Sequence, residues 1–137
     1  MSGLAAILGG HHPAGVYQWH GAMPEAEVKH TVEHAGWDFG LVDGWTHPDK
    51  AGLLAELAAT LSFPVWFGHN FDALADCLRD VTEPMVVLWD GWATLARVDG
   101  NAFEAALDVF MERAGQTPPF AVLLRGDGPE VDVPSLD

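Results

Sequence analysis

The stretch FPVWFGHNFDALADCLRDV, residues 63–81, decides the fold of this chain, because it joins a constrained loop to a capped helix. Pro64 restricts the residue before it to an extended conformation, and Gly68 permits a backbone turn that a side chain would resist. Asn70 is a good N-cap, since its side-chain oxygen can accept from N–H groups that the first turn leaves unpaired. The sequence therefore predicts a loop followed by a helix over residues 71–80.

The predicted helix has two faces of opposite character when its residues are placed at about 100° intervals. The apolar face carries Phe71, Leu74, Leu78 and Val81, with Cys77 at its margin. The opposite face gathers Asp72, Ala75, Asp76 and Arg79. From spacing alone, a solvated surface helix is the commoner interpretation of this acidic face, and a binding helix is the alternative.

The segment GHNFDALADCL, residues 68–78, resembles the barstar family, small intracellular proteins that inhibit secreted microbial ribonucleases. The resemblance continues through an apolar strand at 84–89, and more loosely through a helix at 102–114 and a strand at 120–124. It covers roughly residues 37–125. What it implies is an α/β fold, with a small parallel β-sheet of three to four strands and helices packed against it.

The resemblance also implies a partner-binding surface. Asp72 and Asp76 match the family's acidic inhibitory positions, Trp66 matches an aromatic loop contact, and Glu112 aligns with a peripheral acidic contact. The surface is completed by neighbours in the loop and helix, namely Phe67, Gly68, His69, Asn70, Ala75 and Arg79.

The implied partner is a basic, guanyl-specific ribonuclease of the extracellular type, whose cationic active site the acidic helix and aromatic loop would block. The family's type member has tryptophans where this chain has Ala75 and Val81, and an acid in place of His69. These departures suggest a different partner surface. The alternative is therefore an immunity or regulatory module for another basic toxin or protein.

The charge of the chain points toward a cationic partner. Its 137 residues carry 20 acids against 6 bases, a formal net charge of −14. Phosphate binding needs clustered Lys and Arg, so nucleic acid is not expected as a direct partner. Opposite fields accelerate protein encounter, which makes a basic protein the natural partner. Acidity that serves only solubility is the other interpretation.

The cysteine count and the hydrophobic pattern bear on location. Cys77 is the single cysteine of the chain, which excludes an intramolecular disulfide and fits a reducing compartment. The apolar run at 4–8 is too short for a signal core or a membrane span. We therefore expect a cytoplasmic protein with no membrane association.

The order of patterned segments predicts one domain over residues 15–125, with a core at 36–125. Before the core, a strand at 16–20 and a helix between Pro24 and Gly36 predict an N-terminal strand-helix addition at 15–35, outside the resemblance. Residues 1–14 are Gly-rich and are expected to be flexible. Residues 126–137 are expected to form a loose acidic tail.

Within the core, apolar strands at 37–42, 85–89 and 120–124 alternate with helices, which indicates a parallel sheet with right-handed crossovers. Thr46 and Asp49 resemble a capping pair for a helix at 51–61. Asn101 with Glu104 resembles a capping box for the helix that follows it.

Other chemistries find little support in the sequence. No Gly-rich nucleotide fingerprint or P-loop lysine follows a strand. His11, His12, His30 and His34 leave a metal site open as an alternative, although their spacing specifies no complete ligand set. Asp72 and Asp76 have no predicted apolar pocket, and nothing forms a nucleophile with a base. Neither enzyme activity, nor a metal, nor another cofactor is expected.

Overall fold

The computed structural model describes residues 3–136 and has an α/β fold built on a parallel four-stranded sheet of order β1-β4-β3-β2. Expectations for residues 1, 2 and 137 lie outside the described residues. The strands are β1 (Val16–Trp19), β2 (Asp38–Asp43), β3 (Met85–Asp90) and β4 (Phe120–Arg125). The helices are α1 (Gly3–Leu8), α2 (Glu25–His34), α3 (Lys50–Thr60), α4 (Phe71–Arg79), α5 (Ala93–Val98) and α6 (Gly100–Ala114).

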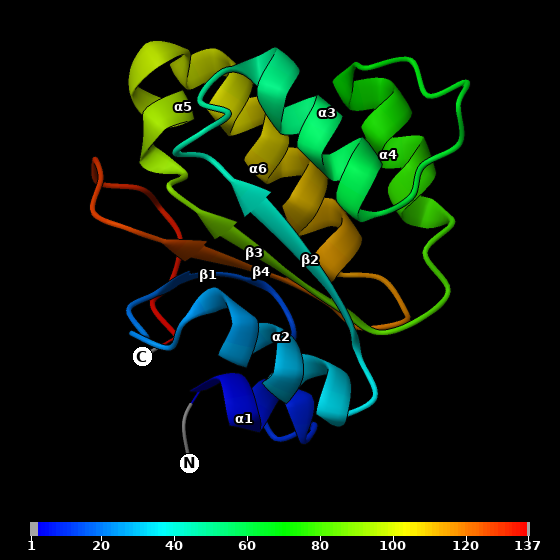
Figure 1. Cartoon of the computed structure of the whole chain (residues 1–137), viewed down its shortest axis with the longest axis vertical. Coiled ribbons are helices and arrows are strands. Elements are labelled where there is room, and N and C mark those ends of the chain that lie inside the picture. The colour runs from blue at the N-terminus through cyan, green and yellow to red at the C-terminus, as the bar shows by residue number, and fades with distance from the viewer. Residues whose placement is uncertain (1–2, 137) are drawn as a thin grey trace.

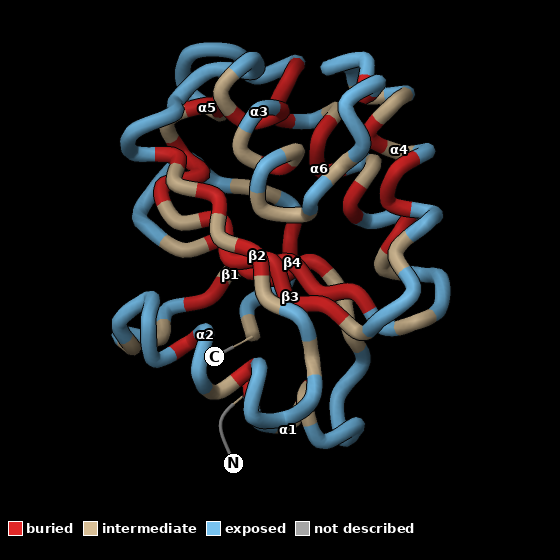
Figure 2. Tube along the Cα trace, turned by 45° about the vertical axis from the view of Figure 1, so that its right-hand side comes forward, coloured by how far each residue is buried: buried red, intermediate tan, exposed pale blue. Residues whose placement is uncertain are grey.

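The sheet separates two helical layers. Figure 1 shows α3, α4, α5 and α6 over one face and α1 with α2 over the other. Figure 2 shows the consequence, a band of buried strands between two partly exposed layers. The predicted α/β fold with a small parallel sheet is confirmed, and so are the additional strand and helix before the core.

The two central strands have continuous apolar sequences because helices cover both of their faces. MVVLWD in β3 and FAVLLR in β4 pair in parallel, and in each strand the first five residues are buried. Val86 and Leu88 of β3 pack in the layer of α1 and α2, whereas Val87 and Trp89 pack in the layer of α3 to α6.

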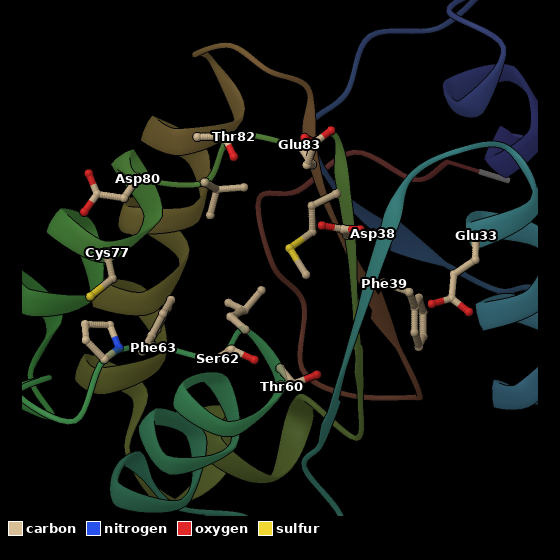
Figure 3. Close-up of a pocket in the computed structure, with 14 residues that line it drawn as sticks. Glu33, Asp38, Phe39, Thr60, Ser62, Phe63, Cys77, Asp80, Thr82 and Glu83 are labelled. Carbon is tan, nitrogen blue, oxygen red and sulfur yellow. The ribbon is translucent and has the colours of Figure 1, made fainter.

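β2 lies at an edge of the sheet, and α3 covers part of that edge. The parallel ladder pairs alternate residues of β2 with β3, so Phe39, Leu41 and Asp43 direct their N–H and carbonyl groups outward. The Leu41 N–H donates to Thr60 Oγ1 at 3.1 Å, and the Asp43 N–H donates to Glu56 Oε1 at 3.2 Å. Side chains of α3 thus protect one half of the edge and leave the half around Phe39 open (Figure 3).

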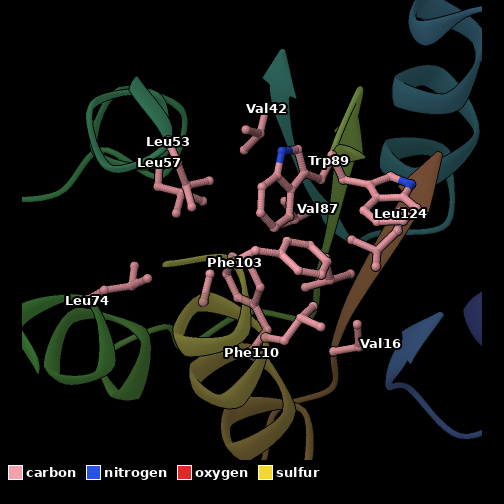
Figure 4. Close-up of a cluster of buried hydrophobic side chains, with 14 of the residues drawn as sticks. Val16, Val42, Leu53, Leu57, Leu74, Val87, Trp89, Phe103, Phe110 and Leu124 are labelled. Atoms are coloured by element: carbon pink, nitrogen blue, oxygen red, sulfur yellow. The ribbon is translucent and has the colours of Figure 1, made fainter. Parts of the chain in front are cut away.

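The larger core lies between the sheet and α3 to α6 (Figure 4). Its centre is aromatic: the ring centroids of Trp89 and Phe103 are 5.7 Å apart, and those of Trp92 and Phe103 are 5.3 Å apart. Leu74 and Leu78 of α4 are fully buried in the same cluster. This burial determines which face of α4 is left for solvent.

The expectation of a flexible N-terminus is wrong for the described part of residues 1–14, because residues 3–8 form α1. Leu4 and Ile7 are buried, one turn apart on the same face of that helix. They join Val28 and Val32 of α2 in a second core beneath the sheet. The Gly-rich composition gave no sign that these two apolar residues cover a face of the sheet.

The expectation of a loose tail is also wrong for residues 126–136, which return to the free edge of β1. The Gln18 N–H donates to the Pro134 carbonyl at 2.9 Å, and the Leu136 N–H donates to the Gln18 carbonyl at 2.9 Å. The side chain of Val133 is buried. An edge strand offers unpaired backbone groups, and the tail satisfies two of them.

Two predicted helix starts need correction. α6 begins earlier than the Asn101 box implied, because Asp99 is its N-cap and accepts from the Ala102 N–H at 3.1 Å. Asp49 caps α3 alone, by accepting from the Gly52 N–H at 2.7 Å. Thr46, its proposed companion, instead donates its hydroxyl to Asp43 at 2.6 Å. α5 was not predicted.

Candidate partner-binding site

α4 is the element that positions the predicted acidic surface, and its start is built as the sequence predicted. The Asn70 side chain accepts from the Ala73 N–H at 2.8 Å, and its amide group donates to the Gly68 carbonyl at 3.0 Å. Asn70 and Gly68 therefore serve the predicted site by shaping the loop-to-helix junction. Next to this junction, the Lys50 Nζ lies 5.0 Å from the centre of the Phe71 ring.

The outer face of α4 carries both predicted carboxylates. Because Leu74, Cys77 and Leu78 are buried, Asp72 and Asp76 are turned to solvent one helical turn apart. Asp76 forms an ion pair with Arg79, and both side chains are more than half exposed. Exposed pairs of this kind contribute about 0–1 kcal/mol, so a partner's cation can compete with Arg79 at small cost.

The loop before α4 separates its two adjacent aromatics. Trp66 is 70% exposed, as expected of a contact residue, and the side chain of Val65 beside it is fully exposed. Phe67 is only 5% exposed, with its ring centroid 5.0 Å from that of Phe63 and 4.9 Å from that of His69. Phe67 is therefore a core residue, and its prediction as a contact residue is wrong.

Val65 is a candidate contact that the sequence did not single out. A loop has no periodicity from which an outward valine could be recognised, and only its position beside Trp66 hinted at exposure. His69 is exposed, with a φ of 45°, and its ring packs edge-on against Phe67. The buried Phe67 thus helps to hold His69 at the surface of the loop.

Helix packing brings the remote predicted residue Glu112 beside α4. Ala75 and Arg79 of α4 line a shallow depression together with Glu112 and Gln116 of the α6 side. Glu112 is exposed there. The predicted residues Ala75, Asp76, Arg79 and Glu112 thus form one connected surface, and Asp72 lies one turn closer to the amino-terminal end of α4. Trp66 is exposed in the loop that leads into this helix.

Arg113 holds α4 in place, a role that no sequence pattern predicted. Arg113 as a whole is only 3% exposed, and its guanidinium donates to the Leu78 carbonyl at 2.8 Å, the Pro118 carbonyl at 2.9 Å and the Val81 carbonyl at 3.4 Å. Burial lowers the pKa of Arg113, and the carbonyls at the negative end of α4 offset its charge. A charged residue near a helix end is expected outside, so nothing in the pattern indicated this role.

Catalytic and metal chemistry has few candidates in the part of the chain described here. Across residues 3–136, His, Cys, Asp and Glu side chains form no group of three or more that could hold a metal ion. His30 and His34 stack on α2 with ring centroids 5.9 Å apart. Burial raises the pKa of the Cys77 thiol, which disfavours the nucleophilic thiolate.

No helix within residues 3–136 is long and apolar enough to span a bilayer.

Comparison with known proteins places this surface in context. The family model described as Barstar (barnase inhibitor) matches residues 37–125, which contain α4, its loop and Glu112. The fold is also similar to the ORC2 protein of Aeropyrum pernix, solved as ADPNP-ADP complexes, with a TM-score of 0.56 and 12% identity over 91% of this chain. It is similar as well to Cdc6p from Pyrobaculum aerophilum, with a TM-score of 0.50 and 17% identity over 90% of this chain.

This chain spans 38% of the ORC2 protein and 37% of Cdc6p. At such identities these two similarities concern the arrangement of strands and helices alone. They carry no information about the side chains of the candidate site.

Proposed function

We propose, from the premise that this chain belongs to the barstar family, that it inhibits a basic microbial ribonuclease of the guanyl-specific, barnase-like class. The observation that carries the proposal is the outer face of α4. There Asp72 and Asp76 stand exposed on a capped helix beside the exposed Trp66, within the segment that matches the family.

The proposed mechanism is electrostatic occlusion of the enzyme's active site. A ribonuclease holds RNA phosphate with arginine, lysine and histidine side chains, so its active site concentrates positive charge. A helix that is rigid before binding can put carboxylates where the phosphates would lie without losing much conformational freedom. Trp66 and Val65 then cover the rim of the cleft and exclude water from the charge contacts.

The test is a titration of this protein into a small secreted guanyl-specific ribonuclease from the same organism, with RNA cleavage as the readout. Asp72→Ala/Asp76→Ala removes the acidic face, and Asp127→Ala/Asp132→Ala removes the same charge from exposed positions of the tail. We expect stoichiometric inhibition by the parent and the tail variant, and its loss in the helix variant. Inhibition by the helix variant equal to the parent's would refute the site.

Loss of one partner from a desolvated ion pair costs about 3–5 kcal/mol. Asp76→Ala alone is therefore expected to weaken the complex by several kcal/mol. No inhibition by a folded parent would refute the ribonuclease as the partner.

A second candidate is an immunity or regulatory module for another basic toxin. It is favoured by Ala75, which leaves the centre of the α4 surface without the tryptophan of the family's type member. The gene neighbourhood separates the candidates, because a secreted ribonuclease gene beside this one favours inhibition and a different toxin gene favours immunity. Under either function, action in the cytoplasm of the producing cell is expected, where Cys77 stays reduced.

A further inference from the structure

A groove of about 440 Å³ lies beside the candidate surface, where the end of α4 and the α3–α4 loop meet the amino-terminal ends of β2 and β3 (Figure 3). The apolar residues of its lining include Phe39, Leu61, Phe63, Pro64, Val81 and Met85. Cys77 and Asp80 from the end of α4 also line it, so the groove is continuous with the helix that carries Asp72 and Asp76.

The charge of the groove is of one sign. Four carboxylates line it, one each from α2, β2, the end of α4 and the α4–β3 loop, and its lining contains no lysine or arginine. They are Glu33, Asp38, Asp80 and Glu83. Glu33 belongs to the N-terminal addition, before the residues that match the family.

The groove also exposes backbone hydrogen-bonding groups. It runs along the edge of β2 at Phe39, where the parallel ladder turns the Phe39 N–H and carbonyl away from β3. Within residues 3–136 these two groups have no hydrogen-bonding partner, whereas the Leu41 and Asp43 N–H groups are occupied by α3. An extended peptide is the ligand that such an edge recognises.

We propose that this groove binds an extended, arginine- or lysine-bearing segment of the cationic partner protein. The segment pairs its main chain with Phe39, buries an apolar side chain between Phe63 and Met85, and directs its cations to the four carboxylates. Charge complementarity selects this occupant, because an acidic or apolar segment would leave the carboxylates unpaired. The proposal rests on the proposed function only for the partner's being a basic protein that contacts α4.

The probe for this proposal is a blocked seven-residue peptide of alternating arginine and valine, titrated into the full chain and followed by backbone amide NMR. We expect the Phe39 amide resonance to shift on binding and its hydrogen exchange to slow, with the Leu41 and Asp43 amides little changed. A Phe39 amide that does not respond while the peptide binds elsewhere would overturn the proposal, and so would the absence of binding.

The variant Glu33→Lys/Glu83→Lys reverses two exposed charges of the groove, and lysine at position 33 suits the last turn of α2. Glu104→Lys/Asp108→Lys makes the same change in net charge on the outer face of α6. We expect the groove variant to bind the peptide about tenfold more weakly and the α6 variant less than about twofold. Equal weakening in both variants would mean that the peptide responds only to the net charge of the protein, and this result would overturn the proposed groove site.

The peptide experiments and the ribonuclease titration together separate this proposal from the proposed function. If the parent inhibits the ribonuclease but the peptide never contacts Phe39, the groove is overturned and the inhibitor assignment stands. If the peptide binds at Phe39 and only the groove variant weakens it, the groove stands even when no ribonuclease is inhibited.

Discussion

Two neighbouring aromatic side chains, Trp66 and Phe67, have opposite surroundings although they share a loop. Trp66 projects into solvent, whereas Phe67 packs on Phe63 and under His69. At this scale a residue's role depends on the direction of one side chain. Trp66 is available to a partner, and Phe67 supports the loop that presents it.

We predict that Trp66→Ala weakens binding to the partner by about 2 kcal/mol and leaves the free energy of unfolding almost unchanged. Phe67→Ala should do the reverse, since it empties a core site and costs about 3 kcal/mol of stability. Urea unfolding and a binding titration on both variants check this. A stable Phe67→Ala protein with impaired binding would restore Phe67 as a contact residue.

Asp43 provides a pH-dependent contribution to stability. Its carboxylate accepts from the Trp45 N–H at 3.0 Å, the Thr46 N–H at 3.2 Å and the Thr46 hydroxyl at 2.6 Å. The hydrogen bond from the Thr46 side chain is the main reason that the pKa of Asp43 lies below its ordinary value of 3.8. A pKa lowered in the folded state gives stability that is present above about pH 4 and lost as the pH falls through the folded pKa.

Asp43→Asn should therefore lower the free energy of unfolding by about 0.5 kcal/mol at pH 7, a small value because water competes for this partly exposed carboxylate. The difference between variant and parent should shrink as the pH falls below about 4. Denaturant titrations at pH 7 and pH 3 measure it. A difference that is constant between the two pH values would contradict the ionic origin of the effect.

At the scale of elements, α4 is held at both ends and presents its acidic face from that position. Asn70 closes its first turn, and Arg113 of α6 binds the carbonyls of Leu78 and Val81 at its end. The same guanidinium reaches the Pro118 carbonyl in the loop before β4. α4, α6 and that loop are thus tied together by one buried side chain.

We predict that Arg113→Met destabilises the protein by about 2–3 kcal/mol, because three carbonyls lose a buried donor. In the variant, amides in the last turn of α4 should exchange with solvent faster than they do in the parent, and this increase should be larger than any increase in β3. Arg97→Met, on the exposed end of α5, serves as the control and should be nearly neutral. Unchanged exchange in α4 would show that the helix needs no such tie.

At the scale of the whole molecule, residues 3–35 complete the fold, because α1 and α2 bury the second face of the sheet. Val86 and Leu88 of β3 lie in that layer with Ala121 and Leu123 of β4, and all four are fully buried. Arg125 of β4 ties the loop before α2 to the sheet, since it donates to the Met23 carbonyl and, at 2.8 Å, to Asp90 of β3.

Removal of residues 1–35 should therefore expose a continuous apolar sheet face, of the kind that drives association. We expect the fragment to self-associate in sedimentation experiments and to bind a hydrophobic dye, while the full chain does neither. A monomeric fragment with cooperative unfolding would show instead that residues 1–35 are dispensable for the fold.

The net charge of −14 makes a separate prediction about association with a cationic partner. If the acidic field steers the encounter, added salt screens it and slows association more than it changes dissociation. Stopped-flow association rates at rising ionic strength test this. Rates that do not depend on salt would remove steering from the mechanism, although the contacts of α4 could still provide affinity.

What the sequence by itself determined is what local physics controls. The Asn70 cap, the two faces of α4 and the continuous apolar runs of β3 and β4 depend on residues within a few positions of one another, and each was predictable. The α/β class followed from the alternation of such segments, and the family resemblance identified the acidic face as the surface to consider.

Only the tertiary structure decided the features that depend on residues distant in the sequence. Phe67 is buried because Phe63 and His69 pack around it, and Arg113 turns inward because the end of α4 lies across from it. α1 is ordered because it covers a face of the sheet, and the tail is ordered because it pairs with the edge strand β1. The groove at Phe39 brings together carboxylates from two stretches that are distant in the sequence, namely Glu33 with Asp38 and Asp80 with Glu83.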